Sequence, residues 1–459
     1  MNVSNTESHF KVINPATGEV VDTCRNCSEV QLEDTVSVAK KAFKLWSKTT
    51  NDDRVSALNK MADIVEENAE QLARLLTLEQ GKPLKGLGAE FEVGIVCDWL
   101  RATAAMSFDN KIVEDSDERQ AVLVRKPIGV VASITPWNWP LMIATWHIAP
   151  AIRVGCTLVI KPANNTPLST LLMVELFNQA LPSGVLSVIT GDVGHKLSSH
   201  PDIDKVIFTG STPVGRLIMK SAAPSLKILT LELGGNDAAI VLPDVDVAKI
   251  AEALFWGAFI NNGQTCLAIK RLFVHADIYD EVCAALTNIA TAMPMGDGLN
   301  EKNIFGPIQN QAQFNRVCAL VDEAKEQGAR VLCGGSAIAG KGFFYPLTLV
   351  ADAKQGMRLV DEEQFGPALP IIKFTDVEQA INSANHCEMG LGGSVWSNDI
   401  AQAKLIAIQI ESGSVWINNH GQVLPHIPFG GVKQSGIGVE FGEEGLLQYT
   451  STQALHIPK

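Results

Sequence analysis

Hydrophobic positions in the first part of the chain recur at helical spacing. Between Leu32 and Leu84, apolar residues fall every three or four positions, which predicts amphipathic helices with one buried face. A further helix is expected from Ala89 to Ala105, where large apolar side chains repeat at intervals of about one helical turn. That stripe consists of Phe91, Ile95 and Trp99.

The pattern becomes extended after this helix. Residues from Ser107 to Val124 alternate loosely around an acidic turn, as the two strands of a hairpin do. A protruding hairpin of this kind suits an oligomerisation arm. The tail from Gln448 to Leu455 predicts a strand that would pair across a subunit interface, so we expect a homodimer or homotetramer.

From Pro127 onward, short apolar runs alternate with helical segments, which indicates doubly wound parallel sheets. The first predicted strands are Gly129–Ile134, Thr157–Lys161, Val185–Thr190 and Lys205–Thr209, with helices at Thr166–Ala180 and Val214–Ala223. A second series follows Leu233, with strands at Ala238–Leu242, Arg271–Val274, Ala329–Leu332, Ala368–Phe374, Leu391–Trp396 and Gly413–Ile417. The predicted fold is therefore α/β, with two doubly wound α/β domains, a cleft between them and a β-hairpin arm.

The composition is that of a compact folded protein that binds no nucleic acid. Of the 459 residues, 46% are hydrophobic and 19% charged, and the formal net charge is −13. Nucleic acids and anionic membranes require clustered lysine and arginine, so both partners are excluded. The N-terminal opening is polar, which predicts no signal peptide. The apolar run Ile128–Ile134 is too short to span a membrane. The nine cysteines are scattered, as in proteins of a reducing compartment, so a cytoplasmic location is expected. Cys24 and Cys27 form an isolated pair, so no metal site is expected.

Three segments carry residues suited to acyl chemistry. Cys266 follows a polar loop, where a thiol can be exposed and have a lowered pKa; the alternative is an inert core cysteine. Glu232 lies between two leucines at a strand end, which would raise its pKa and suit a general base; the alternative is a carboxylate turned to solvent. Asn138 lies in a rigid loop of proline and tryptophan, where its amide could donate a hydrogen bond to an oxyanion; the alternative is that the loop is simply a buried turn.

Together these segments resemble the aldehyde dehydrogenase superfamily, and the resemblance extends over essentially the whole chain. Its signatures are Glu-Leu-Gly-Gly at 232–235 and Gly-Gln-Thr-Cys at 263–266, with the family's spacing. The resemblance implies that Cys266 attacks an aldehyde, and that the Asn138 side chain and the Cys266 backbone N–H hold the oxyanion. It also implies that hydride leaves for a nicotinamide dinucleotide and that Glu232 activates the water that hydrolyses the thioester.

The resemblance further implies a division into domains and a set of cofactor contacts. A nucleotide-binding domain is expected at 1–106 and 128–233, a catalytic domain at 234–435, and an arm with the C-terminal segment at 107–127 and 436–459. The segment 208–215 is similar to the family's nucleotide loop, which opens a helix facing the pyrophosphate. The residues implied to bind the cofactor are Trp137, Lys161, Asn164, Gly210, Ser211, Glu363 and Phe365.

The sequence departs from the family pattern at three places near the cofactor. Asn164 stands where many NAD-preferring members have a glutamate, so NAD is favoured while NADP stays open. His147 stands where many members have a lysine; it is either a packed histidine bonded to a backbone carbonyl or a proton-relay partner. The loop 190–195 is shorter than usual, so altered contacts with the adenosine are expected.

The positions expected to line the substrate tunnel are aromatic and aliphatic: Trp139, Ile143, Trp146, Leu267, Val423 and Leu424. A buried substrate carboxylate would need an arginine, and none is among them, although His420 and His426 lie nearby. The expected substrate is therefore an uncharged aliphatic or aromatic aldehyde, with a semialdehyde second.

Other classes of protein are less favoured. CoA-acylating relatives typically lack the water-activating glutamate, which is present here as Glu232. A thiol esterase would not need the nucleotide loop or Glu363. A catalytically silent scaffold would be expected to have lost Cys266 or Asn138, and both are retained.

Overall fold

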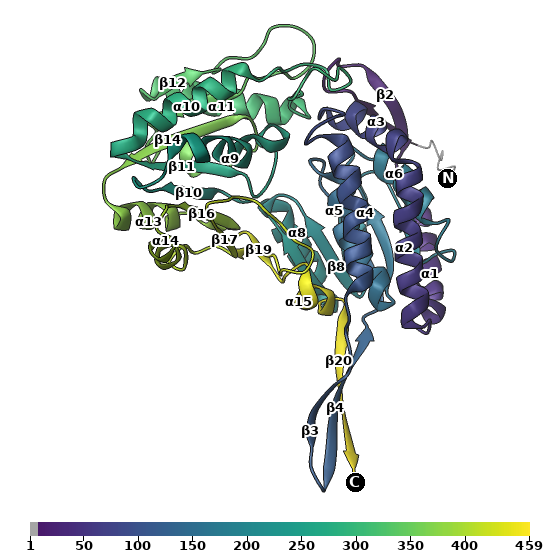
Figure 1. The fold of residues 1–459 in the computed structure, drawn as a ribbon. Coiled ribbons are helices and arrows are strands. Elements are labelled where there is room, and N and C mark those ends of the chain that lie inside the picture. Colours follow the sequence, from purple (N-terminus) through teal and green to yellow (C-terminus); the bar gives the residue numbers. More distant parts are fainter. Residues whose placement is uncertain (1–7) are drawn as a thin grey trace.

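Two sheets covered by helices form the body of the protein in this computed structural model, which describes residues 8–459 (Figure 1). In spatial order, the first sheet contains β19 (Gly436–Ile437), β9 (Ile228–Glu232), β8 (Lys205–Thr209), β5 (Val130–Ile134), β6 (Thr157–Lys161) and β7 (Leu186–Val188). The second contains β12 (Arg330–Cys333), β13 (Thr348–Ala351), β14 (Ala368–Phe374), β11 (Ile269–His275), β10 (Asp237–Val241), β16 (Gly392–Trp396) and β17 (Ser414–Ile417). This arrangement confirms the predicted α/β fold.

The helices cover the sheets in chain order. The first half of the chain contains α1 (Glu29–Trp46), α2 (Asn51–Glu67), α3 (Ala69–Gln80), α4 (Ala89–Ala105), α5 (Pro140–Val154), α6 (Leu168–Phe177), α7 (Gly194–Ser199) and α8 (Thr212–Ala222). The second half contains α9 (Val247–Phe259), α10 (Tyr279–Ala292), α11 (Gln311–Glu326), α12 (Arg358–Asp361), α13 (Val377–Asn385), α14 (Ile400–Ala407) and α15 (Gly442–Leu447). Two small ribbons pair β1 (His9–Ile13) with β2 (Val20–Arg25) and β15 (Met389–Gly390) with β18 (Val432–Lys433).

The order of strands brings two loops of the first sheet together. Strand β5 pairs with β6 on one side and with β8 on the other, all in parallel. The chain therefore changes direction across the sheet at β5, and the loops after β5 and β8 flank one crevice at the carboxyl ends of the strands. Ligands of doubly wound sheets bind at such a crevice.

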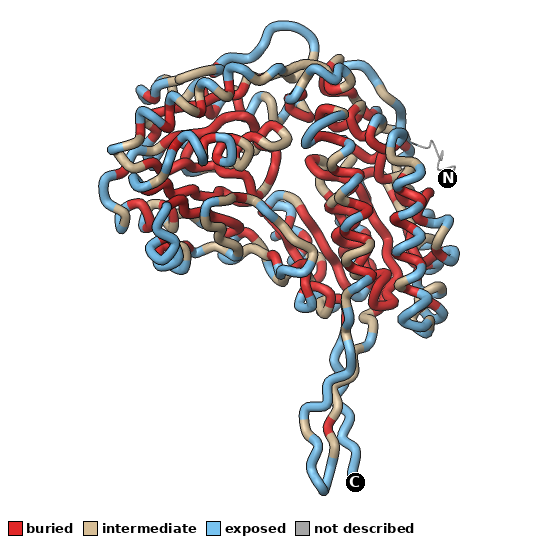
Figure 2. Tube along the Cα trace, viewed as in Figure 1, coloured by how far each residue is buried: buried red, intermediate tan, exposed pale blue. Residues whose placement is uncertain are grey.

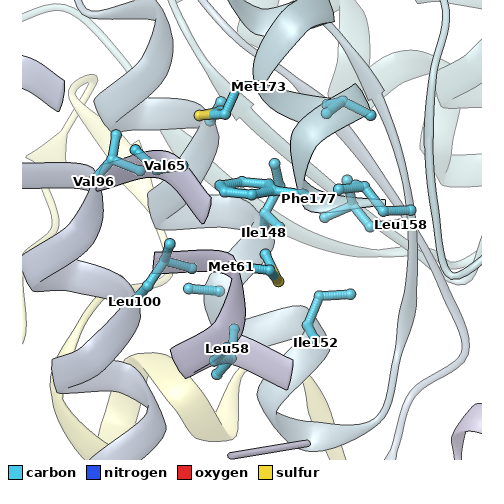
Figure 3. Close-up of a cluster of buried hydrophobic side chains, with 14 of the residues drawn as sticks. Leu58, Met61, Val65, Val96, Leu100, Ile148, Ile152, Leu158, Met173 and Phe177 are labelled. Carbon is cyan, nitrogen blue, oxygen red and sulfur yellow. The ribbon is translucent and has the colours of Figure 1, made fainter. Parts of the chain in front are cut away.

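Helices α2, α4, α5 and α6 pack into one apolar core against β6. Figure 3 shows Met61 of α2 and Phe177 of α6 facing Ile148 of α5, and all three side chains are fully buried. Burying an apolar side chain of this size contributes about 1.5–3 kcal/mol. This core fixes α4 and α5, whose opposite faces line the site described below.

An arm extends away from the body and is exposed along most of its length (Figures 1 and 2). It consists of β3 (Lys111–Asp115), β4 (Arg119–Pro127) and β20 (Thr450–Pro458), in the order β20-β4-β3. The predicted hairpin and the predicted tail strand are both present. The tail, however, pairs with β4 of its own chain along its whole length, from Thr450 opposite Pro127 to Pro458 opposite Arg119. Pairing across a subunit interface stays a prediction.

Most predicted strands have nearly the predicted bounds, and two features differ. Strands β13, β15, β18 and β19 were not predicted, and the last three contain only two residues each. Strand β12 is antiparallel to β13 and β19 is antiparallel to β9, whereas the sequence indicated only parallel neighbours.

The remaining expectations concern the N-terminal region and the membrane. Residues 1–7 of the polar opening lie outside the described part of the chain. Within residues 8–459, no helix is long and apolar enough to cross a membrane. Cys24 is buried in β2, and neither it nor Cys27 forms a disulfide.

Candidate active site

Two cavities meet at Cys266. The first, here called the wide cleft, has a volume of about 540 Å³ and is lined by loops of both sheets, including Trp137, Asn138, Gly210, Ser211, Cys266, Glu363 and Phe365. The second, the apolar tunnel, has a volume of about 280 Å³ and reaches the same cysteine from the other side. Cys266 and Ile143 line both cavities, so a group in either one can approach the sulfur.

The backbone before Cys266 makes an unusual turn. Asn261, Asn262 and Gly263 adopt φ values of +51°, +57° and +66°, in the left-handed region that most side chains avoid. A Cβ atom on Gly263 would lie 2.4 Å from the carbonyl oxygen of Gly366, so no larger residue fits there without movement. The turn leads the chain from α9 towards β11 and leaves the thiol at the junction of the cavities.

Burial raises the pKa of the Cys266 thiol to about 12, although the nearby ammonium of Lys270 opposes this shift. The expectation of a lowered thiol pKa is therefore wrong for the ligand-free protein. Burial removes water that would stabilise the thiolate, and one cation does not replace that solvation. A reactive thiolate thus requires a nearby proton acceptor or added positive charge.

Asn138 lies in the loop between β5 and α5, with its side chain directed at the cysteine loop. Its Nδ2 atom donates to the carbonyl of Gln264 at 2.9 Å. Its own carbonyl accepts from Lys82 Nζ at 3.0 Å and from Asn261 Nδ2 at 2.9 Å. The amide is therefore held at both its backbone and its side chain, and its side-chain partner Gln264 lies two residues before Cys266 in sequence.

Glu232 ends β9 and is only 4% exposed, so the alternative of a solvent-facing carboxylate is wrong. Among the described residues, neither of its carboxylate oxygens has a hydrogen-bond partner. Burial, followed by repulsion from Glu440, raises the pKa of Glu232 well above its usual value, in the direction expected from its apolar neighbours. Its charge makes the smallest of the contributions that raise the pKa of the Cys266 thiol. Among the described residues, Glu232 itself is not part of the lining of either cavity.

His147 of α5 is fully buried. Its Nδ1 lies 2.8 Å from Ser133 Oγ, and its Nε2 lies 3.1 Å from Thr209 Oγ1 and 3.2 Å from Glu440 Oε1. The alternative of a packed histidine is therefore confirmed as to its packing, whereas its expected partner, a backbone carbonyl, is wrong, because side chains of β5 and β8 and a carboxylate face the ring. His147, Glu440 and Glu232 form a buried series of titratable groups.

The predicted cofactor residues fall into two groups. Five of them, Trp137, Gly210, Ser211, Glu363 and Phe365, line the wide cleft. The rings of Trp137 and Phe365 meet edge to face at 5.3 Å, and Glu363 accepts from the N–H of Gly235 at 3.2 Å. Lys161 and Asn164 lie outside this lining, at the end of β6.

The start of α8 offers unused donors to the wide cleft. Ser211 is the N-cap residue of this helix, yet its side chain makes no capping bond. The first-turn N–H groups, together with the positive end of the helix dipole, suit a phosphate group. A Cβ on Gly210 would lie 2.4 Å from the ring of Phe208, so a glycine is needed where the chain turns into the helix.

Asp192 stands beside Asn164 in the shortened loop, and the sequence did not single it out. Asn164 Nδ2 donates to Asp192 Oδ1 at 2.8 Å, and Lys161 Nζ lies 3.5 Å from Asn164 Oδ1. Burial lowers the pKa of Lys161 to about 8, with Asp192 acting in the opposite direction. A carboxylate is therefore present in this cluster although residue 164 itself is an amide.

The apolar tunnel contains five of the predicted substrate residues, namely Trp139, Ile143, Trp146, Leu267 and Val423. Leu424 and His426 do not line it, whereas His420 does. Other tunnel residues were not assigned to the site from sequence: Phe91, Ile95, Trp99, Met142, Trp256 and Ile260. The first three are the stripe predicted on α4, which faces the tunnel. No lysine, arginine, aspartate or glutamate is among the lining residues described.

Comparisons with known proteins agree with this geometry. Residues 2–455 match the model of the aldehyde dehydrogenase family. The chain is 39% identical to phenylacetaldehyde dehydrogenase of Pseudomonas fluorescens, over 99% of this chain and 93% of that protein. It is 37% identical to retinaldehyde dehydrogenase 3 of Homo sapiens, over 99% of this chain and 90% of that protein. The NAD+ complex of an aldehyde dehydrogenase from Bacillus cereus superposes with a TM-score of 0.95 at 35% identity, over 98% and 93% of the two chains.

The raised thiol pKa makes a prediction about Cys266 in the ligand-free protein. Alkylation by iodoacetamide should accelerate about tenfold per pH unit between about pH 7 and pH 9, because only the minor thiolate form reacts below the pKa. Mass spectrometry of the peptide that contains Cys266 measures the rate. Cys387 lines the same cleft and serves as the reference for reagent access. A rate for Cys266 that levels off below about pH 8 would contradict the prediction.

Proposed function

Because this chain belongs to the aldehyde dehydrogenase family, we propose that it oxidises an uncharged, apolar aldehyde to the carboxylic acid with NAD as the hydride acceptor. The observation that carries the proposal is the position of Cys266, which lines both the wide cleft and the apolar tunnel. A sulfur at this junction can bond to an aldehyde carbon from the tunnel while the cleft holds the hydride acceptor.

The chemistry follows from three side chains. The Cys266 thiol loses its proton to solvent, and the thiolate then attacks the carbonyl carbon. The Asn138 amide and the Cys266 backbone N–H stabilise the resulting oxyanion without taking up a proton. Loss of hydride leaves a thioester on the sulfur. Glu232, whose pKa is raised, then takes a proton from water. The hydroxide adds to the acyl carbon, the C–S bond breaks, and the acid and the Cys266 thiolate are released.

The wide cleft fits a dinucleotide. The uncapped start of α8 with Ser211 would hold the pyrophosphate, Glu363 the nicotinamide ribose, and Lys161 the adenosine ribose. Trp137 and Phe365 would flank the ring end. A bound dinucleotide would supply the hydride acceptor and the positive charge of its oxidised nicotinamide. Asp192 supports NAD over NADP, because its negative charge beside Asn164 would repel a 2′-phosphate.

The tunnel supports an apolar substrate. Its volume of about 280 Å³ and its aromatic walls suit an aryl or alkyl group. A semialdehyde is the second candidate, and apart from Cys266 the one ionisable side chain among the described lining residues is His420. That ring, however, already contacts Ser394 Oγ and the Leu267 carbonyl at 2.9 Å each, so it is not free to bind a carboxylate. A CoA-acylating reaction is disfavoured by the presence of Glu232 at the site.

We also propose a proton path, an assembly state and a compartment. Glu232 passes its proton through Glu440 to His147, because histidine is the side-chain type that exchanges protons near neutral pH.

The exposed arm supports a homodimer or homotetramer, since it carries apolar side chains such as Ile112 and Ile457 in an unpacked position. The cysteines of the described chain are free thiols, which supports a reducing compartment such as the cytoplasm.

A panel of aldehydes tests the function. The absorbance of reduced cofactor should rise with aliphatic and aryl aldehydes, and kcat/KM for a carboxylated semialdehyde should be at least about a hundredfold lower, because its charge would be buried unpaired. Cys266→Ala should be inactive with every substrate. Failure of every aldehyde to reduce either cofactor would disprove the proposal, and a strong preference for the semialdehyde would disprove the substrate class.

Substituting Asp192→Asn tests the cofactor preference. Removal of the negative charge should raise kcat/KM for NADP relative to NAD by roughly tenfold, as expected for one charge acting on a phosphate through a solvated medium. Asp34→Asn removes an equal charge from the exposed face of α1 and should leave the ratio unchanged. An unchanged ratio in Asp192→Asn would show that this carboxylate does not discriminate.

His147→Ala tests the proton path. The variant should have a lower kcat and an altered dependence of kcat on pH, with little change in KM, because the tunnel and the wide cleft are not lined by this residue. His200→Ala is the control, since His200 pairs with Glu33 away from the site. A wild-type pH profile in His147→Ala would rule out the relay.

A further inference from the structure

A buried ion pair lies next to the loop between β5 and α5, which carries Asn138. Lys82, in the loop after α3, and Glu92, on α4, have side chains that are 1% and 0% exposed, with Nζ and Oε2 separated by 2.5 Å. Removing two charges from water is costly, and a buried pair gives little net stability compared with apolar residues of the same size. The contacts of this pair point to a different role.

Each partner binds one side of the segment 138–142. Lys82 Nζ donates to the carbonyl of Asn138 at 3.0 Å and lies 3.6 Å from the centroid of the Trp139 ring. Glu92 Oε1 accepts from the N–H groups of Leu141 and Met142 at 2.9 and 3.1 Å, in the first turn of α5. The pair therefore connects the oxyanion amide, a tunnel wall and the start of α5.

Asn261 also donates to the Asn138 carbonyl, at 2.9 Å, but within residues 8–459 the pair alone joins this carbonyl to the start of α5. The N-cap position of α5 is Trp139, which makes no side-chain capping bond, so Glu92 supplies the acceptor that the first turn needs. The indole N–H of Trp139 donates to Thr265 Oγ1 at 2.9 Å, next to the nucleophile. A shift of Lys82 would therefore reach both the Asn138 amide and the loop that carries Cys266.

We propose that Lys82 and Glu92 are positioning residues, which aim the Asn138 amide at the oxyanion and fix the Trp139 wall of the tunnel. This inference rests on the proposed function, in which Asn138 stabilises the oxyanion. Neither residue touches the reacting atoms. Their effect passes through Asn138, where a displacement of about 1 Å can cost roughly a hundredfold in rate.

The double variant Lys82→Met with Glu92→Gln removes both charges at similar volume. The substitution Glu92→Gln retains a side-chain oxygen that can cap α5, so the double variant loses mainly the lysine contacts to Asn138 and Trp139. The matched control is Lys85→Met with Glu90→Gln, because this exposed pair joins the same loop to the same helix, with Nζ and Oε1 2.7 Å apart. Thermal unfolding of each variant measures stability separately from rate.

Two activities are measured for each variant. One is aldehyde oxidation, as kcat and KM. The other is hydrolysis of p-nitrophenyl acetate, which needs the Cys266 nucleophile and the oxyanion donor but neither aldehyde nor cofactor. The Lys82/Glu92 double variant should lose at least about tenfold in both rates, with a melting temperature near that of the wild type. The Lys85/Glu90 control should match the wild type in both.

Asn138→Ala separates positioning from a direct effect on stability. In that background the Lys82/Glu92 substitutions should cause no further loss of ester hydrolysis, because the amide they position is already absent. Wild-type rates in the double variant, or losses that add fully to those of Asn138→Ala, would overturn the inference.

A conservative variant covers the case in which the double variant does not fold. Lys82→Arg keeps the buried charge pair but replaces the compact ammonium with a planar group, so it should fold with reduced kcat. Wild-type kcat in Lys82→Arg would then overturn the inference. If the wild type oxidises no aldehyde while ester hydrolysis still depends on Lys82, the proposed function fails and the positioning role stands.

Discussion

Close contact between backbone segments around Cys266 is the constraint on which the rest of the structure depends. A Cβ atom on Gly235 would lie 2.5 Å from the carbonyl oxygen of Cys266, and one on Gly263 would lie 2.4 Å from that of Gly366. The strand ends of both sheets thus meet the cysteine loop without intervening side chains. This contact leaves the thiol between the wide cleft and the apolar tunnel, where one sulfur can meet two ligands.

Burial then determines the electrostatics of the site. The pKa values of both Cys266 and Glu232 are raised mainly by loss of water, and the repulsion between Glu232 and Glu440 adds to this effect. Burial therefore favours the neutral forms of the Cys266 thiol and the Glu232 carboxyl in the ligand-free protein, and a bound ligand that alters their surroundings would change their protonation. The buried charges beside the Asn138 loop, those of Lys82 and Glu92, form an ion pair that holds the surrounding segments.

The sequence predicted much of this arrangement, because apolar runs and helical stripes follow from burial in any sheet covered by helices. The helix Ala89–Ala105 and the strand Thr157–Lys161 have the bounds read from their patterns. The family resemblance pointed to Cys266, Glu232 and Asn138, and their roles in the reaction are proposals. The pattern could not give contacts between distant segments. The partner of the tail strand, the raised thiol pKa and the approach of Asp192 to Asn164 all arise from tertiary packing.

The central claim is that an acyl group forms on Cys266 and leaves only when Glu232 activates water. The most direct measurement is the intact mass of Glu232→Gln after incubation with NAD and an apolar aldehyde. We expect the mass to increase by that of the acyl group, with the label on the peptide that contains Cys266, while one equivalent of reduced cofactor appears. An unmodified mass, with acid produced at the wild-type rate, would contradict the account.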